Sequence, residues 1–389
     1  MKQNSVSAIG RKLRLGVIGG GIGSFIGPIH RGAATLYEQY EVVASVLSSN
    51  PERSEAMGQK LGIPRSYKTA ELLFAGESER SDKIDVLAIM TPNNSHYELS
   101  CHAMACGFDV LCEKPLTNTL EEAMDLAARA ATTNREYVVA YSYTGYPMVR
   151  QARAMMESGI LGELRMVQSE YVQGHLATLT DSEIAGENWH MNPDIAGPSL
   201  IMGDIATHSY HLASYITGQE PTAVSADITA IVPGRQVDDY CGILSRYENN
   251  ARGSFFVTQA AAGAVHGLRI RVFGSKGSIE WFQERPDELW HRPIDAPAQC
   301  LLRGGLGLSA AANRATHVAM GHPEGYIEAF ANLYQDLADV IIARETDSDL
   351  DPLASWFPTI EDGVRGVAFV EASIRSSQQN STWESLDLS

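Results

Sequence analysis

The first 141 residues alternate between short apolar runs and segments with helical periodicity. The helical segments cover residues 27–38, 51–61, 96–106 and 120–132. Parallel strands need a crossover connection, which a helix usually supplies. The alternation therefore predicts an α/β domain with a doubly wound parallel sheet covered on both faces. Its predicted strands are Arg14–Ile18, Glu41–Leu47, Ile84–Met90, Asp109–Cys112 and Tyr137–Tyr141.

The second part of the chain has a different pattern. After a helical segment over 148–157, strand-like runs follow one another with few helices between them, which indicates a mostly antiparallel sheet. Two late helices are expected over 326–344 and 359–375. We place a boundary near residue 145, giving domains over 1–145 and 146–389. The strand-like runs cover 164–171, 222–231, 240–247, 251–259, 268–273 and 278–281.

Composition excludes several classes of function. The formal net charge of −17 repels phosphate backbones, so no nucleic-acid partner is expected. No apolar run reaches the ~18 residues that span a bilayer, and the polar, basic start over 1–14 is a poor secretory signal. The five cysteines form no CxxC pair, which fits reduced thiols. We expect a cytoplasmic protein without a membrane partner.

A glycine-rich turn follows the first predicted strand and opens a helix, the context that a dinucleotide fingerprint requires. Gly19-x-Gly21 starts it, and Gly27 is the third glycine, three residues later than usual, so Gly23 and Ser24 also lie in the turn. Glycines let the backbone approach a pyrophosphate, and the helix N-terminus supplies N–H donors. A glycine turn without a ligand is the alternative. Its place in the alternating domain favours a Rossmann-type cofactor site.

Two further groups carry possible chemistry. Glu113-Lys114-Pro115 follows the strand 109–112, and ligands of parallel sheets bind beyond the carboxyl ends of strands. A solvated surface lysine is the alternative for Lys114. Asp204, His208 and His211 have a spacing that shares one helix face. They could ligate a metal, act as an acid–base pair, or serve capping and packing.

These motifs together resemble the Gfo/Idh/MocA family, named for glucose–fructose oxidoreductase, inositol dehydrogenase and rhizopine catabolism. The resemblance covers nearly the whole chain. It implies a dinucleotide-binding domain followed by an α/β domain with a large, mostly antiparallel sheet. It also implies a nicotinamide cofactor and a sugar, sugar-derivative or inositol substrate. The matching segments are Gly19-x-Gly21, Thr91-Pro92-Asn93 with His96, Glu113-Lys114-Pro115, and Gly203-Asp204-Ile-Ala-Thr-His208.

The resemblance implies that Lys114, Asp204 and His208 surround the reacting carbon. His208 then accepts the hydroxyl proton, Lys114 polarises the oxygen, and Asp204 positions the substrate or His208. This acid–base interpretation needs no metal. Cofactor contacts are expected from the glycine turn with Gly23 and Ser24, from Ser48, Ser49 and Arg53, from Thr91, Pro92, Asn93 and His96, and from Glu113 and Lys114.

Additional substrate contacts are expected from Tyr143, Asn188 and Trp189. Packing is the more common role for an aromatic residue such as Tyr143 at a domain junction, and a structural loop would explain Asn188 and Trp189 equally well. Asn93 and His96 could likewise only cap the helix that follows them. The segment 317–325 lies outside the family motifs, and we interpret it as a substrate loop of a subgroup.

The second strand ends in Ser48-Ser49, where an acidic residue is frequent in the family. A carboxylate there would repel the extra phosphate of NADP. Hydroxyl donors and Arg53 could instead bind that phosphate, so we expect NADP to be accepted, with NAD not excluded.

The sequence therefore predicts an NAD(P)-dependent dehydrogenase that acts on CH–OH groups of a sugar, sugar derivative or inositol. The alternatives are a reductase of a non-sugar carbonyl or imine, and a nicotinamide-binding sensor without turnover. Lys114 and His208 argue against the sensor, because binding alone does not require them. Few helices are predicted over 160–285 to cover a broad sheet, and the family commonly packs such sheets between subunits. A homodimer or homotetramer is expected.

Overall fold

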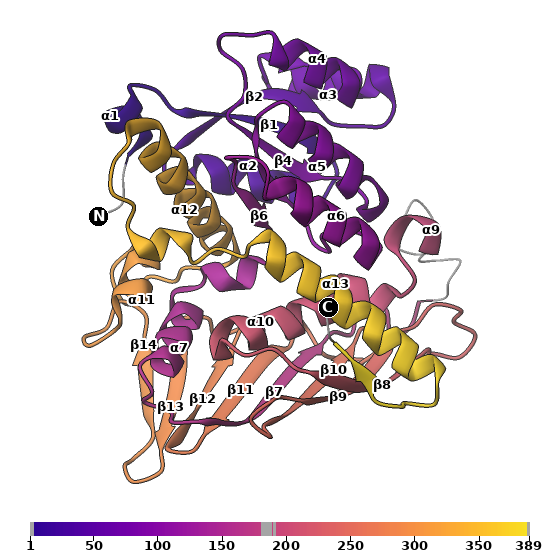
Figure 1. The fold of residues 1–389 in the computed structure, drawn as a ribbon, viewed down its shortest axis with the longest axis vertical. Coiled ribbons are helices and arrows are strands. Elements are labelled where there is room, and N and C mark those ends of the chain that lie inside the picture. Colours follow the sequence, from indigo (N-terminus) through magenta and orange to yellow (C-terminus); the bar gives the residue numbers. More distant parts are fainter. Residues whose placement is uncertain (1–3, 180–188, 190–191, 387–389) are drawn as a thin grey trace. The chain divides into compact units, whose positions relative to one another are not determined.

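The computed structural model describes residues 4–179, 189 and 192–386, which form two compact units (Figure 1). The first unit comprises Met1–Thr117, Glu121–Gly145 and Tyr326–Val364. The second comprises Asn118–Leu120, Tyr146–Gly325 and Arg365–Ser389. Residues 326–364 thus belong to the first unit rather than to a contiguous second domain over 146–389. Among the described residues, no helix has the length and apolar character that a membrane crossing needs.

The first unit contains a six-stranded parallel sheet in the order β3-β2-β1-β4-β5-β6. Every residue of β4 is buried, as expected for a strand with both faces covered. The predicted doubly wound sheet is therefore confirmed. The strands are β1 (Leu13–Gly19), β2 (Tyr40–Val46), β3 (Arg65–Ser66), β4 (Val86–Met90), β5 (Asp109–Cys112) and β6 (Tyr137–Val139).

Helices connect these strands and cover the sheet (Figure 1). The late helix α12 (Tyr326–Thr346) packs against α2 (Ile26–Leu36), and its Phe330, Leu333 and Tyr334 join the core formed by β1 and β4. This burial explains why residues 326–364 belong to the first unit. The other helices are α1 (Ser5–Ile9), α3 (Pro51–Lys60), α4 (Ala70–Ser78), α5 (His96–Ala105) and α6 (Leu120–Ala130), with short turns η1 (Asn93–Ser95), η2 (Ser142–Gly145) and η5 (Pro352–Ser355).

The second unit contains a nine-stranded sheet in the order β14-β13-β12-β11-β7-β10-β9-β8-β15. Neighbouring strands are antiparallel except β7 and β10, which are parallel, so the predicted mostly antiparallel sheet is confirmed. The strands are β7 (Leu164–Val172), β8 (Ala223–Thr229), β9 (Tyr240–Arg246), β10 (Arg252–Thr258), β11 (Leu268–Gly274), β12 (Gly277–Phe282), β13 (Glu288–Pro293), β14 (Gln299–Leu302) and β15 (Glu384–Ser385).

One face of this sheet carries helices, and the other carries large exposed side chains. The helix α10 (Thr207–Thr217) packs on β7, β10 and β11, and α7 (Pro147–Glu157) packs on β12 and β13. The opposite face, which we call the open sheet face, presents Met166, Leu244, Phe256 and Trp290, with exposed fractions of 38–57%. Further helices are α9 (Pro193–Ala196), α11 (Ala310–Ala315) and α13 (Ile360–Gln378).

Candidate active site

The glycine turn is packed so tightly at Gly21 and Gly27 that neither position can accept a side chain. A Cβ at Gly21 would lie 2.2 Å from the carbonyl oxygen of Leu47, at the end of β2. A Cβ at Gly27 would lie 1.9 Å from the carbonyl oxygen of Gly20. The turn therefore leaves an uncovered backbone cradle before the N-terminus of α2, which fits the pyrophosphate of a dinucleotide. Gly19, Gly23 and Ser24 also lie in this turn, where the Ser24 hydroxyl accepts a hydrogen bond from the Gly27 amide at 3.3 Å.

The residues after β2 are arranged as a helix cap. Asn50 Oδ1 accepts from the Arg53 amide at 2.9 Å and so caps α3, while the Ser48 hydroxyl accepts from the Asn50 amide at 3.2 Å. Ser49 and Arg53 are exposed. A second cation that the sequence prediction omitted, Lys68, lies 3.9 Å from carboxylate oxygens of both Glu52 and Glu55 on α3. The α3 start therefore combines hydroxyls and two basic side chains with the carboxylates of Glu52 and Glu55, which pair with Lys68.

Lys114 follows the carboxyl end of β5, as predicted, and is partly exposed. The peptide bond between Lys114 and Pro115 is cis. Its neighbour Glu113 accepts a hydrogen bond from the Lys114 amide at Oε2 (3.2 Å) and is bonded at Oε1 to His30 of α2 (3.0 Å). Through Glu113 and His30, these hydrogen bonds connect the Lys114 backbone to α2, the helix that begins at the glycine turn.

His96 occupies a different environment from the one expected of a cofactor ligand. It is fully buried, with Nδ1 2.9 Å from the carbonyl oxygen of Pro115 and Nε2 3.0 Å from that of Thr91. Carbonyl oxygens only accept hydrogen bonds, so both ring nitrogens carry protons and the ring is an imidazolium. Its side chain joins the segment after β4 to the segment after β5. Pro92 follows Thr91, and the buried Asn93 begins η1.

Asp204 and His208 lie in the second unit, where the helix has an unusual start. Met202–Ala206 (η4) is a wide π-helical turn that leads into α10. Such turns frequently occur at functional sites. Asp204 lies in this turn and accepts a hydrogen bond at Oδ2 from Gln259 Nε2 (2.8 Å). His208 is buried in α10, and its ring centroid is 6.4 Å from that of Tyr171.

A polar network extends from Asp204 through residues that the sequence prediction did not select. Gln259 also bonds Gln173 (3.3 Å), Gln173 bonds His266 Nδ1 (3.3 Å), and His266 Nε2 bonds the Tyr171 hydroxyl (2.7 Å). Burial lowers the pKa of His266. Gln173 and Gln259 each directly follow a strand, β7 and β10 respectively. Polar residues at strand ends were the signal in the sequence that could have identified them.

His211 has packing partners of a different kind. It is buried in α10, and its ring centroid lies 6.1 Å from that of Tyr215. Within the described part of the chain, no three His, Cys, Asp or Glu side chains are grouped as a metal site would require.

The remaining predicted substrate residues have varied surroundings. Tyr143 is buried in η2 with its ring centroid 6.3 Å from that of Tyr326. The Trp189 carbonyl accepts from the Asn192 amide at 3.0 Å, and Asn188 lies outside the described residues. The segment 317–325 is built around Glu324, whose Oε1 accepts from the amides of His317 and Val318 and from the buried Arg303.

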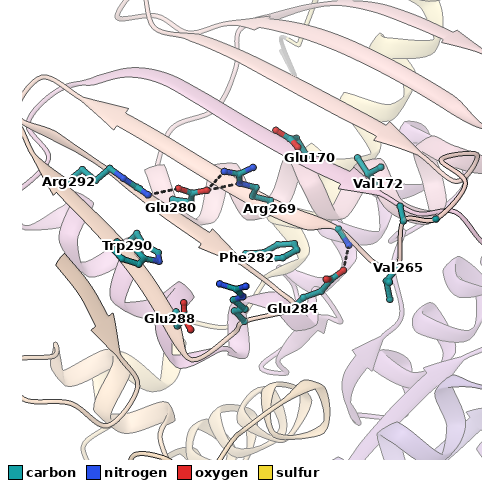
Figure 2. A pocket seen from close by; sticks show the side chains of 14 residues that line it. Glu170, Val172, Val265, Arg269, Glu280, Phe282, Glu284, Glu288, Trp290 and Arg292 are labelled. Carbon is teal, nitrogen blue, oxygen red and sulfur yellow. Dashed lines mark hydrogen bonds and ion pairs between the residues drawn. The ribbon is translucent and has the colours of Figure 1, made fainter. Parts of the chain in front are cut away.

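The open sheet face contains a shallow hollow of about 800 Å³ (Figure 2). A charged row crosses it: Glu280 is bonded by Arg269 (2.7 Å) on one side and by Arg292 (2.9 Å) on the other. Figure 2 shows Trp290 and Phe282 beside this row. The lining of the hollow mixes acidic and basic side chains, so it has no field of one sign, and Phe282 and Trp290 add aromatic surface to it.

Comparison with known proteins agrees with these features. Residues 13–141 match the oxidoreductase family with an NAD-binding Rossmann fold, and residues 149–280 match the Gfo/Idh/MocA C-terminal domain. An uncharacterised oxidoreductase of Bacillus subtilis is 35% identical over 98% of this chain and 99% of its own. A levoglucosan dehydrogenase of Pseudarthrobacter phenanthrenivorans is 27% identical over 96% of this chain and 98% of its own.

Among solved structures, an inositol dehydrogenase homologue from Azotobacter vinelandii, in complex with NADH and myo-inositol, superimposes with a TM-score of 0.88. It is 34% identical, and the match covers 96% of this chain and 98% of that one. The similarity therefore extends over both units. Together with the glycine turn, the Glu113-Lys114-Pro115 strand end and the Asp204–His208 helix, it shows that this chain belongs to the Gfo/Idh/MocA family of oxidoreductases.

Proposed function

We propose that the protein is an NAD(P)-dependent dehydrogenase that interconverts a secondary hydroxyl and a ketone on a sugar, sugar derivative or inositol. The observation that carries this proposal is the hydrogen-bonded group of Asp204, Gln259, Gln173 and His266 near His208. It offers donors and acceptors at short spacing, as recognition of a polyol requires. The substrates named for the inositol dehydrogenase homologue and the levoglucosan dehydrogenase support the same substrate class.

The proposed reaction separates a proton from a hydride. His208 accepts the proton of the substrate hydroxyl, and Lys114 stabilises the negative charge that develops on the oxygen. Asp204, held by Gln259, positions the substrate or the His208 ring. A nicotinamide held by the glycine turn would supply the acceptor for the hydride on the same carbon, so that a C–H and an O–H bond of the substrate break and a C=O bond forms. The glycine turn is proposed to bind its pyrophosphate.

Substrate identity is tested with a panel of inositols, aldoses, glycosides, anhydrosugars and other polyols, assayed with both cofactors by absorbance of the reduced nicotinamide. Turnover of at least one cyclic polyol is expected. Turnover restricted to a non-sugar carbonyl or imine, assayed in the reducing direction, would replace this proposal. NADH binding without turnover of any compound would instead favour a sensor.

We further propose that NADP is accepted alongside NAD. Ser48, Ser49 and Arg53 place hydroxyls and a guanidinium at the α3 start. These groups suit a phosphate, and no carboxylate follows β2 directly. Arg53→Ala should lower the ratio of catalytic efficiencies for NADP over NAD several-fold, whereas Lys60→Ala, at the far end of α3, should leave it unchanged. A strong NAD preference that is unaffected by Arg53→Ala would contradict this assignment.

We propose a second copy of this chain as the partner of the open sheet face. This face exposes Met166, Phe256 and Leu244 on the adjoining strands β7, β10 and β9, and Trp290 further along the sheet on β13. Apolar surface of this extent marks an interaction site. A homodimer, or a homotetramer built from it, would bury these side chains.

A further inference from the structure

A line of hydrogen bonds runs through the first unit from α12 to Lys114. The Tyr334 hydroxyl lies 2.8 Å from His30 Nδ1, and His30 Nε2 lies 3.0 Å from Glu113 Oε1. Glu113 Oε2 accepts from the Lys114 amide at 3.2 Å. His30 and Tyr334 are both fully buried, whereas Glu113 is partly exposed. None of the roles considered above uses His30 or Tyr334.

The chemistry of the partners sets the direction of each bond. Burial raises the pKa of Tyr334, and the Glu113 carboxylate acts in the same direction, so the phenol keeps its proton. Within the described residues, His30 Nδ1 is the acceptor that the structure offers to this proton. The imidazole proton is then on Nε2, where it donates to the carboxylate. Both oxygens of Glu113 are thereby held, one by a buried side chain and one by the Lys114 backbone.

Ring packing fixes the orientation of the imidazole. The His30 ring centroid lies 4.8 Å from that of Phe330 and 5.9 Å from that of Tyr334, both on α12. His30 also lies one turn beyond Gly27 on α2. The Glu113 carboxylate is therefore hydrogen-bonded to α2, the helix whose N-terminus forms the cofactor cradle.

We propose that His30 is a positioning residue for Lys114, holding the Glu113 carboxylate against the lysine backbone and coupling the lysine to the glycine turn through α2. Tyr334 supports this role by fixing which nitrogen of His30 carries the proton. The inference rests on the role proposed above for Lys114. Loss of the His30–Glu113 bond frees the carboxylate and loosens the Lys114 backbone, while the cofactor cradle stays in place.

Two substitutions at one position separate positioning from packing. The amide nitrogen of His30→Gln reaches the place of Nε2 and can still donate to Glu113. The shorter His30→Asn reaches only the place of Nδ1 and loses that bond. Both remove the ring, so both lose its contacts with Phe330. A role confined to packing predicts equal defects in the two variants.

The first measurement needs no substrate. Hydrogen exchange of the Lys114 amide is followed by mass spectrometry in the ligand-free protein, with β12 of the second unit as the internal reference. The amide should exchange at least tenfold faster in His30→Asn than in the wild type and close to the wild-type rate in His30→Gln. Equal exchange in the two variants would overturn the proposal. Should His30→Asn fail to fold, Glu113→Ala replaces it. An exchange rate of the Lys114 amide in Glu113→Ala that equals the wild-type rate would also overturn the proposal.

The second measurement uses the panel alcohol that the wild type oxidises fastest. His30→Asn should lower kcat by ~10²-fold, the cost of a misplaced catalytic group, with the Kd for NADH within about twofold of the wild type. His30→Gln should recover most of kcat. A kcat that falls equally in both variants would also contradict the proposal. A wild-type protein without turnover contradicts the proposed function instead, and the exchange result then decides the role of His30 alone.

Discussion

Gly27 and Gly20 meet backbone to backbone, because a Cβ on Gly27 would lie 1.9 Å from the Gly20 carbonyl oxygen. Gly27→Ala must therefore push the turn apart, and we expect it to weaken NADH binding at least tenfold and to destabilise the protein by ~1–3 kcal/mol. NADH fluorescence titration and thermal unfolding measure the two effects.

The same helix provides the control for this substitution. A Cβ at Gly32 on α2 would meet no atom within 4 Å, so Gly32→Ala should leave NADH binding intact. Its higher helix propensity should raise stability by about 0.5–1 kcal/mol. NADH affinity that is unchanged in Gly27→Ala would show that the turn is not the cofactor cradle.

Lys114 and His208 are expected to dominate turnover. Lys114→Ala removes the charge that stabilises the developing alkoxide, and His208→Ala removes the proposed base, so each should lower kcat by about 10²–10⁴-fold. NADH affinity should change little in either variant. Lys60→Ala and His102→Ala, at exposed positions in the first unit, serve as controls and should keep normal turnover. Near-normal turnover in Lys114→Ala or His208→Ala would refute the assigned role.

Introducing negative charge on the open sheet face tests whether that face is the subunit interface. Phe256→Glu and Leu244→Glu place carboxylates on the exposed apolar surface and should dissociate an oligomer into 42.3 kDa protomers. Leu72→Glu, at an equally exposed position on α4, should keep the wild-type mass. Light scattering at micromolar protein concentration measures the molar mass of each variant. A monomeric wild-type protein would rule out this interface.

Local patterns in the sequence predicted many elements closely. The strand expected over 109–112 is β5 (Asp109–Cys112), and the helix expected over 326–344 is α12 (Tyr326–Thr346). The periodicity of α12 indicated a helix but not its partner, so its place in the first unit was not predicted. β13 (Glu288–Pro293) was not predicted because only Leu289 is buried in it, so no apolar alternation marks the strand.

Candidate site residues were predictable where a motif marks a strand or helix end, as for Lys114 and Asp204. Their supporting partners were not, since those come from distant segments. Gln259 follows a strand 55 residues after Asp204, and Tyr334 lies 304 residues after His30. His96 matched a motif, but sequence spacing could not reveal that its two acceptors are the backbone carbonyls of Thr91 and Pro115.

The buried imidazolium of His96 makes the stability of the first unit depend on pH. Burial alone would lower the pKa of His96, but Cys112 and the carbonyls of Pro115 and Thr91 outweigh it and raise the pKa to about 9. The bonded, protonated ring makes its full contribution to stability at pH values below the ordinary pKa of ~6.5. This contribution is lost as the pH rises through 9. The loss should be on the order of 3 kcal/mol.

Wild-type protein should therefore lose more stability between pH 6 and pH 9.5 than His96→Gln does, as measured by thermal or urea unfolding. The control variant His102→Gln should follow the wild type. Parallel curves for the wild type and His96→Gln would show that His96 is uncharged in the fold.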